Sequence, residues 1–328
     1  MAKYNLSFTG PQIQAILEKA SLTATLLSEP TGFTNNNLIV VTYDDVNRTI
    51  SLHGDFEAYY KGVKIPELTN GWTSDPHPVE HGTYFLHYCD TGFKFTTEPW
   101  YFECLQIAFV QSNNYRIGLR EVHGFMDWRT HKVFHETLGT YRISGGNLVA
   151  GSYTLGSTVA DNRRPHVATT VIQDEDLLTT LAGSTDRLYT HRYMSVDGLR
   201  AFTPLQADIL PIVGGVPQWN QKISEGVWQQ TPMSNGQYAC VFLVAIPVTS
   251  DIESQYYRYC WLQPQQVGTL EQALALLPQQ LDIGDPGALV TEFVYVNKVI
   301  IYMTAGSWSI HSTRLLTGSR YSQIPNPQ

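Results

Sequence analysis

The sequence predicts a mainly β protein in which a short N-terminal amphipathic helix precedes two β-sandwich or barrel-like domains. Charged residues make up only 15% of the chain, whereas aromatic residues make up 12% and include 19 Tyr. This balance favours strands over long surface helices, which normally need many Glu, Lys and Arg residues. Short alternating segments separated by Gly, Asp and Asn recur along the chain, as they do in sandwiches and barrels. Helix signals gather at the start instead.

The length of 328 residues is too great for one small core, so two domains and an accessory segment are expected. A small, polar stretch at residues 144–157 is the best place for a boundary. We therefore expect a helical anchor or oligomerisation segment at 1–32 and a β-rich domain at 33–150. A second β-rich domain should occupy 151–328 and contain a short helix near 270–278.

The first helix has three start signals. Thr9 is a good N-cap, Gln12 completes a capping box, and Phe8 can pack on Ile13. Five apolar side chains that follow have heptad spacing, and Ile16 widens their stripe: Ile13, Leu17, Ala20, Ala24 and Leu27. An isolated helix of this length is marginal in water, so its apolar stripe needs a partner surface. That surface is either the helix's own domain or another chain, and we predict that Phe8 and these six residues form an oligomerisation or docking surface.

Strand-like segments begin after residue 35. Residues 38–43 and 48–53 alternate around an Asp–Asn-rich turn and predict a hairpin. Further strands are predicted at 56–65, 83–88, 104–110, 115–119, 238–246, 256–262, 293–296 and 299–302. One helix should interrupt the later strands near Thr269, where Gln272 again completes a capping box.

Charge and hydropathy exclude some partners. The formal net charge is -8 and no run of Lys or Arg occurs, which disfavours extended nucleic-acid contact. The longest apolar runs have the length of strands, so neither membrane insertion nor a secretory signal is expected. The four cysteines lie far apart with no C-x-x-C pair. Buried free thiols of a protein assembled in a reducing cytoplasm are the first interpretation, and a disulfide pair is the alternative.

Histidines cluster between residues 123 and 136. If the segment from Asp127 is helical, Asp127, His131 and His135 share one face, and such a face could hold Zn²⁺ or another divalent ion. The zincin order H-E-x-x-H is absent, because Glu136 follows the second histidine of the pair. A packed, hydrogen-bonded turn and helix is therefore the interpretation that we prefer, and we expect no metal or other cofactor.

Other catalytic patterns are missing. The chain has no nucleophile elbow, no phosphate-binding glycine loop and no dinucleotide fingerprint, so an enzyme is not expected. Two carboxylates are nonetheless enough for glycoside hydrolysis. Candidates for such a pair are Glu98, Glu103, Asp174, Glu175 and Asp176. A further polar group, Asp75, His77 and His81, is interpreted as the surface of a proline-rich loop.

Tryptophan side chains offer a clue to binding. Several lie in loop-like settings next to Asn and Gln, where a flat ring could stack on a sugar or anchor an interface. The residues that we predict for contact with a partner or a glycan are Trp72, Trp219, Trp228 and Trp261.

Two segments resemble bacteriophage virion proteins. Residues 4–17, which begin Tyr4-Asn5-Leu6 and continue Thr9-Gly10, are similar to the opening of phage appendage proteins, where Y-N-L-x-x-T-G-x-x-[IV] leads a short helix. Residues 123–140 resemble an H-G-x-x-M-D-like stretch that ends T-H-x-x-x-H-x-T-x-G-T in phage tail and fibre proteins. In this chain the methionine directly precedes the aspartate. The two segments cover about 32 residues, and neither motif is catalytic.

The resemblance implies a structural or adhesive component of the virion, assembled in the host bacterial cytoplasm. It suggests a fibre-like appendage, such as a head fibre, a tail fibre or a collar or baseplate part. Its expected partners are copies of itself, with a trimer favoured, other virion proteins and a host-surface glycan. A glycan-degrading depolymerase and a carbohydrate-binding module of the virion stay open as alternatives.

Overall fold

The computed structural model describes residues 29–80, 82–112, 117–184, 189–196, 200–203, 206–248, 258–283 and 292–316. Within these residues the protein consists mainly of β-strands arranged in several hydrogen-bonded sheets. The predicted mainly β class is thus confirmed. The predicted helix that carries Phe8 to Leu27 lies outside the described residues.

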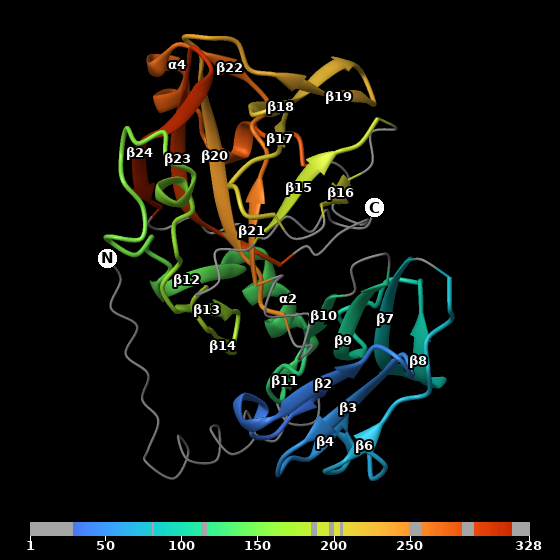
Figure 1. Cartoon of the computed structure of the whole chain (residues 1–328). Helices are drawn as coiled ribbons and strands as arrows, with labels where there is room; N and C mark the ends of the chain where they lie inside the picture. The colour runs from blue at the N-terminus through green and yellow to red at the C-terminus, as the bar shows by residue number, and fades with distance from the viewer. Residues whose placement is uncertain are drawn as a thin grey trace, which may run out of the picture.

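Three sheets come from the first part of the chain, at the bottom of Figure 1. The first has the order β11-β1-β4-β5, the second β10-β9-β7-β8 and the third β2-β3-β6. Their strands are β1 (Pro30–Phe33), β2 (Val40–Asp44), β3 (Thr49–His53), β4 (Ala58–Tyr60), β5 (Val63–Lys64), β6 (Trp72–Thr73), β7 (Gly82–Cys89), β8 (Gly92–Thr96), β9 (Leu105–Ser112), β10 (Ile117–Arg120) and β11 (Met126–Asp127). The predicted hairpin is confirmed, since β2 pairs antiparallel with β3.

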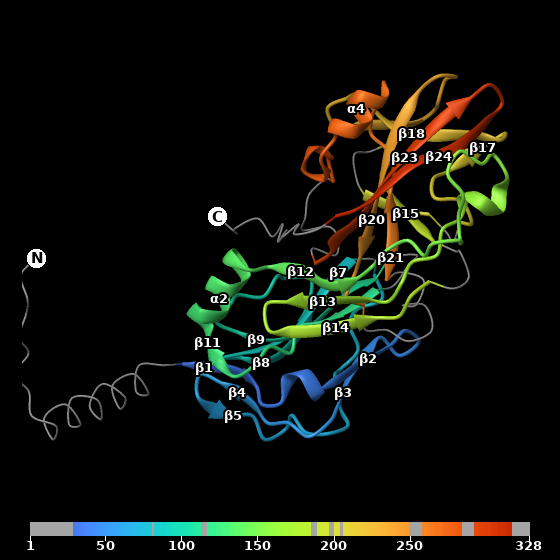
Figure 2. The same ribbon diagram turned by 90° about the vertical axis from the view of Figure 1, so that its left-hand side faces the viewer.

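A helix and a small sheet follow in the middle of the chain. Helix α2 (Trp128–Thr137) is succeeded by β12 (Thr140–Gly145), β13 (Thr170–Asp174) and β14 (Leu177–Leu181), which form an antiparallel sheet. Both views place these elements between the first-part sheets and the large later sheet (Figures 1 and 2). Because β12 pairs with β13, the boundary predicted near residue 150 falls within the connection between two paired strands.

The last part of the chain forms a seven-stranded sheet and a three-stranded one. The large sheet has the order β16-β15-β21-β20-β23-β24, with β22 also paired to β20, and the small one has the order β17-β18-β19. The strands are β15 (Thr190–Met194), β16 (Arg200–Phe202), β17 (Ile212–Val213), β18 (Val216–Ser224), β19 (Val227–Pro232), β20 (Tyr238–Ala245), β21 (Tyr259–Leu262), β22 (Val267–Gly268), β23 (Val294–Thr304) and β24 (Ser307–Leu315). Helix α4 (Leu270–Ala275) begins at Thr269 with the predicted capping box.

Strand β20 explains why a long apolar run can be one strand. Successive side chains point to opposite faces of a sheet, and both faces of β20 are covered. Val241 and Leu243 belong to the core between the later sheets, whereas Phe242 and Val244 pack in a second core on the other face. That second core also contains Phe109 of β9, so the first-part and last-part sheets share buried apolar surface.

Two of the four cysteines form a disulfide, and the other two are free. Cys89 at the end of β7 and Cys104 just before β9 form a disulfide, with a Cα–Cα separation of 4.9 Å. The prediction of free thiols is therefore wrong for this pair, because β7 pairs with β9 and brings the two residues together. Cys240 and Cys260 are free and buried, as predicted.

Candidate functional site

Three histidines and five carboxylates gather where the middle elements meet the first-part sheets. The histidines are His123, His131 and His135, and the carboxylates are Glu121, Asp174, Glu175, Asp176 and Glu292. All three imidazoles are nearly buried, with side-chain exposures of 6%, 8% and 9%. We call this group the histidine–carboxylate cluster.

Helix α2 positions two of the histidines. The Asp127 side chain caps the helix by accepting a hydrogen bond from the Arg129 N–H at 2.9 Å, which satisfies a donor that the first turn leaves free. His131 and His135 lie four residues apart and so share one helix face. Both are buried, which the polar character of an imidazole permits only if polar partners are nearby.

Glu175 is the carboxylate partner of both. It lies in the two-residue turn between β13 and β14 and adopts a left-handed backbone conformation with φ of 49°. That conformation is uncommon for a residue other than Gly, Asn or Asp. His135 Nδ1–H donates to Glu175 Oε1 at 2.5 Å, and His131 Nε2 lies 2.8 Å from Glu175 Oε2. The turn thus places the buried Glu175 carboxylate in contact with both His131 and His135 of helix α2.

His123 reaches the cluster from the segment between β10 and β11. The Phe33 N–H of β1 donates to the His123 carbonyl at 2.8 Å, which fixes this segment beside β1. A Cβ at Gly32 would lie 2.2 Å from the Gly124 carbonyl oxygen, so glycine is required there. A Cβ at Gly124 would in turn lie 2.7 Å from the Asp176 carboxylate. The close approach of the Gly124 backbone therefore explains Gly32, and the Asp176 carboxylate explains the glycine that follows His123.

The His123 imidazole contacts carboxylates through both nitrogens. Nδ1 lies 2.7 Å from Asp176 Oδ1 and 3.6 Å from Glu175 Oε2, and Nε2 lies 3.2 Å from Glu121 Oε2. The His123 and His131 rings also lie against each other, with centroids 4.1 Å apart. The two rings and the acidic turn form a single contact group.

These contacts change the proton affinities of the cluster. Burial would raise the pKa of Glu175, but the close approach of His131 and His135 outweighs it and lowers that pKa. Burial would lower the pKa of His123, but its hydrogen bonds with Asp176 and Glu121 raise it well above the usual range. Burial, together with the neighbouring His123, lowers the pKa of His131. These shifts favour an ionised Glu175, a protonated His123 and a neutral His131.

The remaining carboxylates lie deeper. Burial raises the pKa of Glu121, and burial together with the charge of Asp174 raises the pKa of Glu292 well above its usual range. Asp174 accepts a hydrogen bond from the Thr140 hydroxyl at 2.7 Å. Glu292 comes from the segment just before β23, so the cluster joins the first, middle and last parts of the chain.

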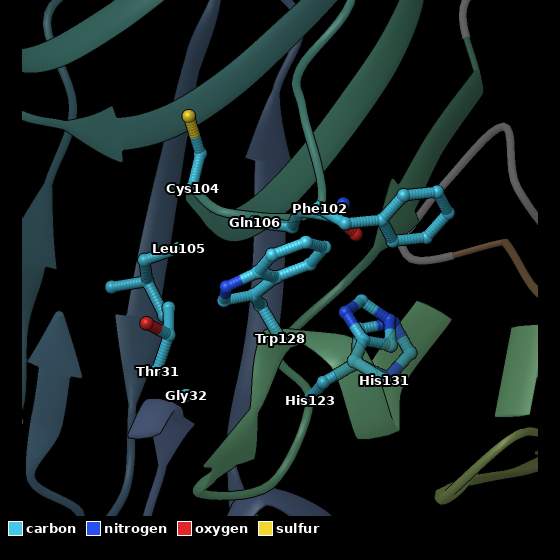
Figure 3. A pocket seen from close by; sticks show the side chains of 9 residues that line it. All are labelled: Thr31, Gly32, Phe102, Cys104, Leu105, Gln106, His123, Trp128 and His131. Atoms are coloured by element: carbon cyan, nitrogen blue, oxygen red, sulfur yellow. The ribbon is translucent and has the colours of Figure 1, made fainter. Parts of the chain in front are cut away.

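A small pocket borders the cluster. His123 and His131 line it together with Trp128 of α2 and Phe102, and Figure 3 shows the two imidazoles side by side below the Phe102 ring. The remaining lining residues are Thr31, Gly32, Cys104, Leu105 and Gln106. Its cavity volume is about 10 Å³, which is room for about one water molecule. The pocket therefore has room for a water molecule but no space for a sugar ring.

The sequence-based site is right in part. His131 and His135 do share a buried helix face, but Asp127 is not on it as a third ligand, because its carboxylate caps the helix and contacts Arg129 and the Glu29 N–H. The carboxylate that completes the face is Glu175, which follows His135 by 40 residues. The strand pairing of β13 with β14 creates that contact, and no local spacing in the sequence signals it. The acidic run at 174–176 was its only sequence signal.

The second histidine group is exposed only in part: Asp75 is exposed, as predicted for a polar loop, but His77 is not. His77 is fully buried, stacks on Tyr84 with centroids 4.5 Å apart, and lies 2.9 Å from the Tyr43 hydroxyl through Nε2. His81 lies outside the described residues. The prediction of a polar loop surface is therefore wrong for His77, which packs in the first-part core.

Two of the four tryptophans predicted to contact a partner are buried, and two are partly exposed. Trp228 is 3% exposed and Trp261 is completely buried, so a surface contact at these two positions is wrong. Both lie on strands that face a core, where a large apolar ring is best covered. Trp72 and Trp219 are half-buried and keep part of their rings at the surface.

Imidazole nitrogens and carboxylate oxygens are the ligand types of Zn²⁺ and other divalent transition metals. The set His123, His131 and Glu175 offers three such atoms within 4.8 Å of one another, and all three residues are buried. The same groups can also share protons as an internal ion-pair network.

No helix among the described residues is both long and apolar enough to cross a membrane. Comparison with known proteins finds no matching family model, curated protein or solved structure.

Proposed function

We propose that this protein is a structural and adhesive component of a bacteriophage particle, such as a fibre-like appendage of the head, tail, collar or baseplate. In this proposal the N-terminal segment, residues 1–32, contains an apolar helix that ends before β1 and assembles copies of the chain, with three copies favoured. The β-rich regions 33–150 and 151–328 then act as two sandwich or barrel units that contact other virion proteins and a host-surface glycan.

One observation carries the proposal. The block at residues 123–140, which resembles phage tail and fibre proteins, turns its three histidines inward. There they contact a strand end of the first part and the β13–β14 turn. Because the histidines of this block hold distant chain segments together, the block supports a structural role for the protein. Three of the five acidic candidates for glycan hydrolysis, Asp174, Glu175 and Asp176, are engaged in contacts of the histidine–carboxylate cluster.

The oligomeric state tests the first half of the proposal. We expect the full chain to have about three times the monomer mass by light scattering after size-exclusion chromatography. Replacing Ile13 and Leu17 with Ser should reduce it to a monomer, because both residues lie on the predicted apolar stripe. Replacing Gln14 and Glu18, which lie outside the predicted stripe, with Ser is the matched control and should leave the mass unchanged. A monomeric full chain would contradict the proposal.

The location of the protein tests the second half. Mass spectrometry of purified particles of the encoding phage should detect the chain, and antibody labelling in electron micrographs should mark a projecting appendage. Absence of the chain from purified particles would contradict a virion role. New reducing ends after incubation of the protein with host polysaccharide would instead favour the depolymerase alternative.

A further inference from the structure

We propose that His123, His131 and Glu175 bind one divalent transition-metal ion of the Zn²⁺ class. The ion would link three segments that are distant in the sequence: the residues after β10, the face of helix α2 and the β13–β14 turn. Its role is to hold the histidine–carboxylate cluster together. This inference does not depend on where the protein acts.

The distances suit such an ion. Zn²⁺ holds nitrogen and oxygen ligands at 2.0–2.2 Å, so in a tetrahedron the donor atoms lie about 3.3 Å apart. Glu175 Oε2 lies 2.8 Å from His131 Nε2 and 3.6 Å from His123 Nδ1, which brackets that separation. Small rotations of the two rings would place all three donors around one centre.

The surroundings of Glu175 Oε2 point to the same place. This oxygen belongs to a side chain that is only 1% exposed, and it faces two imidazole nitrogens, His131 Nε2 at 2.8 Å and His123 Nδ1 at 3.6 Å. A buried ionised carboxylate is costly unless it is paired, and a metal ion shared with both nitrogens would reduce that cost. The other oxygen, Oε1, is already held by the His135 Nδ1–H. Such a second contact is what orients a metal-binding carboxylate.

The charge of the surroundings also favours a cation. Five carboxylates meet three imidazoles here, and among the described residues the salt bridges to Glu121, Glu175 and Asp176 come from histidines alone. Arg120 contributes to Asp176 and Glu121 only through longer-range attraction. A divalent ion would offset the charge of the carboxylates that face the imidazoles, Glu175 and Asp176.

Asp176 lies beside the three donor residues and fixes the position of His123. Its Oδ2 accepts hydrogen bonds from the Gly124 N–H at 2.6 Å and from the Asn36 side-chain amide at 2.8 Å. Its Oδ1 then lies 2.7 Å from His123 Nδ1, on the same side as Glu175. Two imidazoles with the Glu175 carboxylate make a ligand set that suits Zn²⁺ better than Ca²⁺ or Mg²⁺, which prefer oxygen alone.

The test measures metal content and affinity on the full chain. Chelator-treated protein should take up about one Zn²⁺ per chain, and Co²⁺ should bind at the same stoichiometry with a visible d–d spectrum. His131→Asn and Glu175→Gln should abolish this uptake, whereas His135→Asn should weaken it by roughly 10- to 100-fold, as expected for a residue that orients a ligand.

Two controls separate this site from other possibilities. Asp127→Asn should keep full Zn²⁺ binding, because the Asp127 carboxylate caps α2 and lies outside the donor set. His53→Gln removes an exposed histidine and should also leave binding unchanged. Loss of Zn²⁺ in Asp127→Asn with retention in Glu175→Gln would overturn the assignment of ligands.

A final variant distinguishes a metal from an ion-pair network. His131→Cys should still bind Zn²⁺, because a thiolate is a metal ligand, but a cysteine cannot replace the imidazole in an ion pair with Glu175. The wild-type melting temperature should fall on chelation and recover with Zn²⁺, a readout that needs no folded variant. Failure of the chelated wild-type chain to take up Zn²⁺ or Co²⁺ would refute the proposal.

Discussion

The side chain of Asn220 in β18 binds both backbone groups of Met194 in β15. The Met194 N–H donates to Asn220 Oδ1 at 2.8 Å, and Asn220 Nδ2 donates to the Met194 carbonyl at 2.9 Å. Asn220 has no exposed surface. The side chain thus continues the hydrogen bonding of β15 and attaches the three-stranded sheet to the seven-stranded one.

Asn220→Ala should therefore destabilise the protein by about 2–4 kcal/mol, since it leaves a buried N–H and a buried carbonyl without partners. Urea unfolding followed by fluorescence would measure the change. Gln230→Ala is the matched control, because Gln230 lies opposite Asn220 in the β18–β19 register but is exposed. Equal stability of the two variants would show that the paired contact is not formed in solution.

Asp127→Ala should cost about 1 kcal/mol, the usual value for the loss of a helix N-cap. The reason is that the Arg129 N–H at the start of α2 loses its acceptor. Asp127→Asn keeps a capping oxygen and should remain close to the wild type. Thermal unfolding of both variants gives the comparison, and a larger loss in the Asn variant would contradict the capping role.

Reduction of the Cys89–Cys104 disulfide should lower stability by about 3 kcal/mol, because the bond closes a loop of 15 residues. The double variant Cys89→Ser with Cys104→Ser should show the same loss without reductant. Thiol titration gives a second check. The oxidised chain should expose no thiol when native and two when denatured, since Cys240 and Cys260 are buried and burial raises the pKa of each to about 12. Four reactive thiols in denatured, unreduced protein would rule out the bond.

Acid should weaken the protein through His191. Burial lowers the pKa of His191 to about 4, whereas the unfolded chain takes up this proton near pH 6.5. Between these values the unfolded state binds more protons, so stability is complete above pH 6.5 and falls as the pH drops toward 4, by roughly 3 kcal/mol. His191→Gln should flatten that dependence while keeping a donor for the Asp208 carbonyl, which His191 Nε2 contacts at 2.7 Å. His53→Gln, at an exposed position, should retain the wild-type slope.

Local signals in the sequence predicted local structure well. The capping box at Thr269, the hairpin of β2 and β3 and the helical placement of His131 and His135 all depend on residues close together in the chain. Each is decided by backbone hydrogen bonds within a few residues, so spacing carries the information.

Long-range contacts were not predictable in the same way. Glu175 joins His135 only because β13 and β14 form a two-residue turn against α2, and Cys89 meets Cys104 only because β7 pairs with β9. Trp261 looked like a surface aromatic, but β21 lies inside the large sheet. The partners of these residues are chosen by sheet order, which a single sequence does not specify.

The residues of the histidine–carboxylate cluster are synthesised at different times, because they are far apart in the chain. Glu121 and His123 emerge early, Glu175 follows, and Glu292 emerges only after most of β15 to β21 has been made. The cluster therefore cannot be complete until that last segment has been made. This part of the core reaches its final composition only when almost the whole chain has been synthesised.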